Sequence, residues 1–138
     1  MAAVDGSDSS MNAAEYVFIL AKNMKAQVTV VNIVDLSSIF KMLPPETRKQ
    51  LIAIGRKEAH RMLEAAEELA KQHDLKIRTE VIESSVSVAD AIIKYTKENN
   101  VDLIVAVTKG RTGMKKVVLG SVASKLVTYS PCSVLVVR

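Results

Sequence analysis

Residues 103–107 read LIVAV, and this run is the clearest indication of the fold class. A continuous run of apolar, largely β-branched residues is typical of a strand covered on both faces, as in a parallel sheet. Residues 28–34 (VTVVNIV) and 133–137 (SVLVV) have the same character. Two further strands are expected, over residues 1–5 and 77–83. Polar and apolar residues alternate more strongly in 77–83, which favours a place at an edge of the sheet.

Helical patterns separate these runs. Apolar side chains recur at helical spacing in four segments: residues 10–24, 45–73, 87–99 and 121–128. Asp8 is expected to cap the first of these helices, and Ser87 stands three residues before Asp90, as in a capping box. The alternation of strand and helix predicts right-handed βαβ units, and the length of 138 residues fits one domain, residues 1–138.

Composition excludes several classes of protein. Cys132 is the only cysteine, so no intrachain disulfide and no thiol metal cluster can form. No apolar run approaches the roughly 20 residues that span a bilayer, and residues 1–5 do not resemble a signal peptide. His60 and His73 have no nearby partner residues of a catalytic motif. These features predict a cytoplasmic protein.

The candidate for chemistry lies in the last third of the chain, where most of the net positive charge gathers. Gly110 lets backbone amides approach a ligand, and Gly120-Ser121 opens a helix whose N-terminus favours an anion. Lys109 and Arg111 add positive charge. This combination predicts a phosphate site. A tight turn, an ordinary serine helix start and a solvated charged face would also account for it.

These residues resemble the nucleotide-binding signature of the universal stress proteins, which reads Gly, two residues, Gly, nine residues, then Gly-Ser or Gly-Thr. Gly110, the nine residues 111–119 and Gly120-Ser121 match it. The flanking residues 101–105 and 119–123, the end of the chain (130–138) and its start (3–7) are also similar to the family.

The resemblance implies a three-layer α/β/α, Rossmann-like fold with a five-stranded parallel sheet in the order 3-2-1-4-5. It implies a stress-response regulatory protein that binds ATP, with Mg²⁺ on the phosphates, and a homodimer paired through the edge strand Ser133–Val137. Strands 1 and 4 would then flank the crevice where strand order reverses. The candidate nucleotide-binding residues, including the basic ones and the first signature position, are Asp5, Ile33, Val107, Lys109, Gly110, Arg111, Gly120, Ser121 and Val122.

One departure from the signature keeps a second function open. Val107 stands where the family has its first glycine, and its branched side chain can fill space meant for the nucleotide. The alternative is therefore a homodimeric interaction module that binds no nucleotide, its pocket closed by Val107. An enzyme is not expected beyond weak ATP hydrolysis, because residues 5–9 lack the SGGxDS loop of related synthetases. Nucleic-acid binding is not expected, because no aromatic residues stand among the basic ones. No membrane association is expected.

Overall fold

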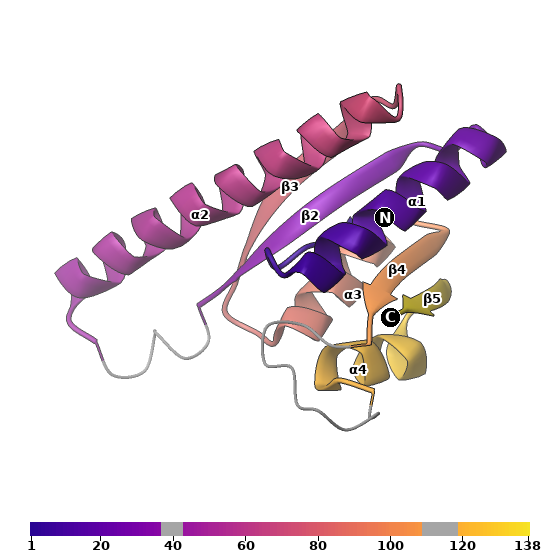
Figure 1. Ribbon diagram of the computed structural model, residues 1–138. Coiled ribbons are helices and arrows are strands. Elements are labelled where there is room, and N and C mark those ends of the chain that lie inside the picture. Colours follow the sequence, from indigo (N-terminus) through magenta and orange to yellow (C-terminus); the bar gives the residue numbers. More distant parts are fainter. Residues whose placement is uncertain (37–42, 109–118) are drawn as a thin grey trace.

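The computed structural model describes residues 1–36, 43–108 and 119–138, and these form five parallel strands and four helices (Figure 1). The sheet order is β3-β2-β1-β4-β5, which confirms the α/β fold and the strand order that the resemblance implied. The strands are β1 (Ala2–Ala3), β2 (Val28–Asp35), β3 (Ile77–Ser84), β4 (Leu103–Val107) and β5 (Ser133–Val137). The helices are α1 (Asp8–Met24), α2 (Pro45–Gln72), α3 (Val88–Glu98) and α4 (Ser121–Tyr129).

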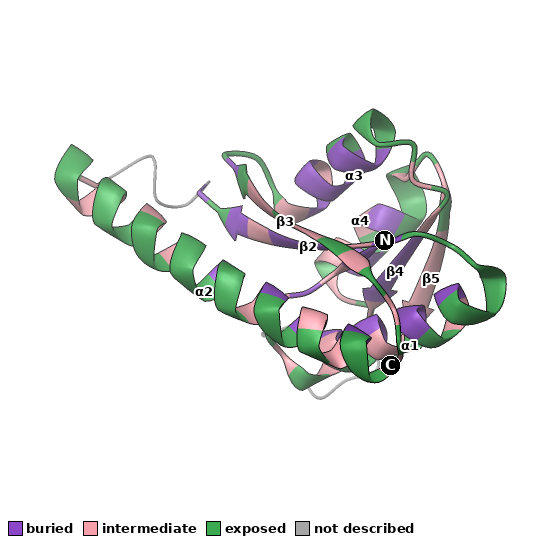
Figure 2. Cartoon of the chain, turned by 90° about the horizontal axis from the view of Figure 1, so that it is seen from above, coloured by how far each residue is buried: buried purple, intermediate pink, exposed green. Residues whose placement is uncertain are grey.

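Two apolar clusters hold the three layers together, because successive strand residues point to opposite faces. Helices α1 and α2 cover one face and α3 and α4 cover the other (Figure 2). On β2, Val30 packs toward α1 and α2, whereas Val31 packs toward α3. On β4, Val105 packs in the cluster on the side of α1 and α2, and Ile104 packs in the cluster on the side of α3 and α4. Burial on both faces is what the continuous apolar runs predicted.

Several predicted element boundaries are wrong by one or two residues. Helix α1 begins at Asp8, because Ser7 and not Asp8 is its N-cap: the Ser7 hydroxyl accepts a bond from Ser10 N. Helix α2 ends at Gln72 and α4 continues to Tyr129. Ser87 caps α3 as predicted, accepting from Asp90 N. Strand β3 lies at an edge of the sheet, as its alternation indicated.

Strand β1 is shorter than the predicted residues 1–5, yet it occupies the centre of the sheet. Its ladder hydrogen bonds reach beyond its two assigned residues. Val4 N donates to Val31 O at 2.9 Å, and Val105 N donates to Met1 O at 2.9 Å. The chain then turns away after Val4. This exit places Asp5 at the carboxyl end of the sheet, beside the ends of β2 and β4.

Candidate functional site

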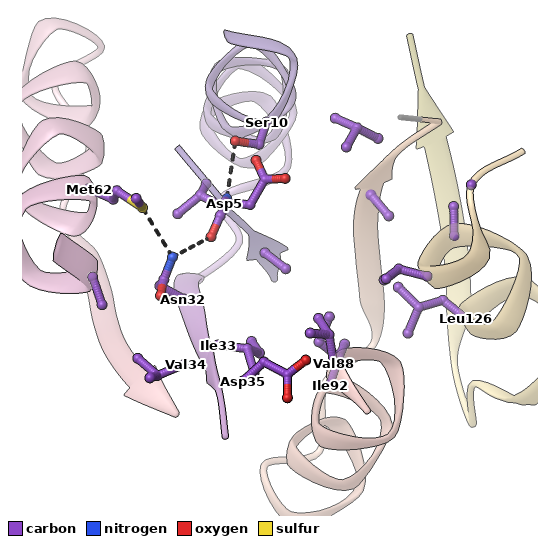
Figure 3. Close-up of a pocket in the computed structure, with 18 of the residues that line it drawn as sticks. Asp5, Ser10, Asn32, Ile33, Val34, Asp35, Met62, Val88, Ile92 and Leu126 are labelled. Carbon is purple, nitrogen blue, oxygen red and sulfur yellow. Dashed lines mark hydrogen bonds between the residues drawn. The ribbon is translucent and has the colours of Figure 1, made fainter. Parts of the chain in front are cut away.

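A crevice of about 630 Å³ opens at the carboxyl ends of β1, β2 and β4 (Figure 3). Strand order reverses at this point, because β2 and β4 lie on opposite sides of β1 and their connections leave in opposite directions. The crevice is lined by these predicted site residues: Asp5, Ile33, Val107, Gly120, Ser121 and Val122. Lys109, Gly110 and Arg111 lie outside the described residues. The structure thus brings together residues from both ends of the chain, and their role in binding stays a prediction.

Asp5 shapes the turn that leads from β1 into α1. Its Oδ1 accepts hydrogen bonds from Ser7 N at 3.0 Å and from Ser7 Oγ at 2.6 Å. Its backbone N donates to Ser10 Oγ at 3.2 Å. Gly6 adopts a φ of 80°, which residues with a Cβ rarely adopt. The Asp5 carboxylate therefore faces the crevice while it also organises the start of α1.

The N-terminus of α4 forms the opposite wall. Gly120 N donates to Thr108 O at 2.8 Å, so Gly120, although it was predicted as a binding residue, has no free amide to offer an anion. The following amides of Ser121 and Val122 belong to the first helical turn, where no intrahelical acceptor is available. Both residues line the crevice. The anion-binding part of this wall is thus the first turn of α4 rather than the residue before it.

Replacing Gly120 with alanine is expected to lower the free energy of unfolding by about 1–3 kcal/mol, the usual range for overpacking. A Cβ on Gly120 would lie 2.9 Å from Thr108 O, a backbone atom that cannot rotate away. Chemical denaturation measures the loss. Ser124→Ala, at an exposed position of the same helix, is the matched control and should change stability little. Equal midpoints for Gly120→Ala and the control would contradict the close approach.

Val107 lines the crevice, but its side chain does not close it. Its side chain is half-buried and packs against the cluster beneath α1 and α2. Among the described residues, a cavity of about 630 Å³ remains with this valine in the wall. The space next to β4 is narrower than a glycine would leave it, because a branched side chain projects there.

A third wall comes from residues that the sequence analysis did not single out. Asn32 of β2 and Met62 of α2 line the crevice, as does Gly55, whose missing Cβ would lie 3.0 Å from Val34 Cγ1. Asn32 Nδ2 donates to Val4 O at 2.8 Å and to Met62 Sδ at 3.3 Å. The available signal was the single amide in the otherwise apolar run of residues 28–34.

Charged groups near α4 are already paired. Lys125 Nζ lies 2.7 Å from Asp90 Oδ2 and ties α4 to α3. The hydrogen bonds from Lys125 and then Ser87 hold the pKa of the Asp90 carboxyl below its usual value. Lys125 is therefore occupied by an ion pair. Among the described residues, no three acidic, cysteine or histidine side chains are grouped to hold a metal, and no helix is long and apolar enough to cross a membrane.

Comparison with known sequences gives a family. The sequence matches the Universal stress protein family over residues 1–138. A universal stress protein of Methanocaldococcus jannaschii is 36% identical over 135 residues, which cover 97% of this chain and 78% of the relative. The universal stress protein YxiE of Bacillus subtilis is 32% identical over 145 residues, with 100% of this chain and 97% of the relative covered.

Solved structures share the fold. The universal stress protein UspA from Lactobacillus plantarum superposes with a TM-score of 0.87 at 24% identity, covering 99% of this chain and 94% of that one. An Archaeoglobus fulgidus universal stress protein in complex with dAMP and an Arabidopsis thaliana family protein with AMP bound each give a TM-score of 0.71, at 19% and 17% identity. They cover 99% of this chain and 94% and 88% of their own. By sequence and architecture together, the chain belongs to the universal stress protein family.

Proposed function

We propose that this protein binds an adenine nucleotide, ATP in particular, in the crevice at the carboxyl ends of β1, β2 and β4, and acts as a regulatory protein of the stress response. The observation that carries the proposal is the crevice itself, which joins a helix N-terminus to an apolar slot. A nucleotide has the matching pair of ends, an anionic phosphate chain and a flat base. Two solved relatives, one in complex with dAMP and one with AMP bound, support this ligand class.

The walls suggest how the ligand lies. Phosphates suit the first turn of α4, where the amides of Ser121 and Val122 and the helix dipole favour negative charge. Lys109, Gly110 and Arg111 adjoin β4 in sequence and are proposed to contribute there. The ribose would lie near Asp5, and the base near Ile33 at the end of β2. Mg²⁺ would be held mainly by the phosphates, as is usual for this ion with nucleotides.

The regulatory role follows from what the crevice offers chemically. Within the described residues, three carboxylates line the crevice, those of Asp5, Asp35 of β2 and Glu58 of α2. That of Asp5, at the end of the central strand, already accepts two hydrogen bonds from Ser7. Hydrolysis would therefore be slow, and occupancy rather than turnover would carry the signal. We further propose that the protein acts in the cytoplasm as a homodimer paired through β5, an edge strand of the sheet, since unpaired edges favour pairing with another chain.

Calorimetric titration tests the proposal. ATP, AMP and GTP are titrated separately into the protein, each with and without Mg²⁺. We expect one adenine nucleotide per chain, with binding of ATP strengthened by Mg²⁺ because the ion offsets repulsion among the phosphates. Absence of binding heat and of any thermal stabilisation by ATP or AMP at millimolar concentration would contradict the proposal, since ligand binding to the folded state stabilises it.

A homodimeric module without a nucleotide is the second candidate, and Val107 in the crevice wall favours it. Exposed Val127 and Tyr129 of α4 are further apolar surface available to a partner. In this case the wild-type protein binds no ATP, whereas Val107→Gly gains binding by reopening the space next to β4. Sedimentation of the wild type would still give a dimer.

A further inference from the structure

Asn32 is a buried amide whose orientation is fixed. It is only 7% exposed, although it lies in the wall of the crevice. Its Nδ2 donates to Val4 O at 2.8 Å and to Met62 Sδ at 3.3 Å (Figure 3). Among the described residues, none donates a hydrogen bond to Asn32 Oδ1. Asn32, a lining residue of the crevice, therefore keeps an acceptor that the described part of the chain leaves unused.

The amide cannot turn around to offer a donor instead. Rotation by 180° would place Oδ1 against Val4 O, so that two acceptors would face each other at about 2.8 Å. Rotation would also bring Oδ1 to Met62 Sδ in place of Nδ2. The bond would then be lost, because the thioether sulfur has no proton to donate. A free asparagine accepts or donates as the ligand requires. Asn32, held in this orientation, can only accept a hydrogen bond from a donor of the ligand.

Asn32 also lies at the end of the crevice where a base would sit. It belongs to β2, and β1 separates it from β4, which precedes α4. Neighbouring strands are about 4.8 Å apart, so β2 and β4 are about 10 Å apart. That separation suits a nucleotide with its phosphates at α4 and its base at β2. Gly55, Ala59 and Met62 of α2 line the crevice on the same side as Asn32, together with the carboxylate of Glu58.

We infer that Asn32 Oδ1 accepts a hydrogen bond from the exocyclic amino group of a 6-aminopurine and so selects adenine over 6-oxopurines. This inference rests on the proposed function. A 6-oxopurine brings a carbonyl to the place of the amino group, and two oxygen acceptors then meet at a buried side chain. Leaving a buried polar group unpaired is costly, and this cost produces the discrimination.

The test compares ligands first, because it then uses the unaltered protein. ATP and ITP differ at the purine C6 position, with an amino group in ATP and an oxygen in ITP. We expect ITP to bind about tenfold to a hundredfold more weakly than ATP. N6,N6-dimethyl-ATP, which keeps the nitrogen but has no proton to donate, should be weakened as well. 2′-Deoxy-ATP, which keeps the amino group, should retain most of the affinity.

A variant then assigns the discrimination to the residue. Asn32→Leu keeps a similar volume without the acceptor and is expected to bring the ATP-to-ITP affinity ratio below about threefold. Asn23→Leu makes the same change on exposed α1, outside the crevice, and should leave the ratio as in the wild type. Circular dichroism establishes that both variants are folded.

The outcomes separate the inference from the function on which it rests. Equal binding of ATP and ITP by the wild type overturns the inference and leaves nucleotide binding standing. A loss with 2′-deoxy-ATP but not with ITP would show that the crevice discriminates at the ribose, and it would overturn base selection. An unchanged ratio in folded Asn32→Leu overturns it too. If no nucleotide binds, the proposed function fails first and the inference fails with it.

Discussion

Replacing Phe18 with alanine is expected to lower the free energy of unfolding by about 3–5 kcal/mol, the usual cost of truncating a buried aromatic residue. Phe18 is 0% exposed and is among the largest fully buried side chains of the described residues. It lies on α1, in the cluster that joins α1 and α2 to the sheet, and its ring centroid is 6.2 Å from that of His73. Truncation would leave a cavity where three elements meet.

The expected loss is a large share of the stability of a small domain, which is typically about 5–15 kcal/mol. Equilibrium denaturation in urea measures it. Tyr16→Ala is the matched control, because Tyr16 is an aromatic residue of the same helix that is 50% exposed, and its loss should cost little. If the two variants unfold at the same urea concentration, the packing of α1 on the sheet is not as described.

The strands and helices could be predicted because their signals are local, whereas the order of the strands came from the family resemblance. The runs that became β2 and β4 are mostly apolar and rich in β-branched residues, and burial on both faces accommodates such a pattern. Helix boundaries were less accurate because caps depend on neighbours. Ser7 takes the N-cap of α1 in a turn held by the Asp5 carboxylate, and no helical periodicity encodes that contact.

The candidate site could be predicted only in part, for a similar reason. Asp5 was found because it ends the first predicted strand, and Ser121 because the signature closes with Gly-Ser at a helix start. The Thr108 carbonyl that occupies the Gly120 amide could not be inferred from the glycine itself. Asn32 was missed because its meaning depends on Val4 and Met62, which lie 28 and 30 residues away in sequence. A polar residue in an apolar strand becomes informative once its partners are known.

Ser121→Asp is expected to weaken ATP binding at least about a hundredfold while leaving the fold as stable as before or more so. Ser121 is the first residue of α4, is exposed, and lines the crevice. The first turn of α4 contains no acidic residue. An aspartate there interacts favourably with the helix dipole, by about 0.3–1 kcal/mol, so the free protein gains stability.

When phosphate is bound, the aspartate at position 121 becomes unfavourable. Like charges about 4 Å apart near a protein surface repel by about 4 kcal/mol, which exceeds the gain from the dipole and accounts for the loss of affinity. Opposite changes in stability and binding separate this repulsion from general unfolding, which would lower both. Calorimetry and thermal unfolding measure the two quantities on the same sample.

Ser124→Asp is the matched control. It makes the same substitution one turn further along α4, at an exposed position outside the crevice, and should leave the ATP affinity within about threefold, because exposed charges further from the phosphates are screened. Raised salt should restore part of the binding of Ser121→Asp for the same reason. Full ATP affinity in Ser121→Asp would mean that the phosphates do not lie at the start of α4, and the orientation of the nucleotide proposed here would then be wrong.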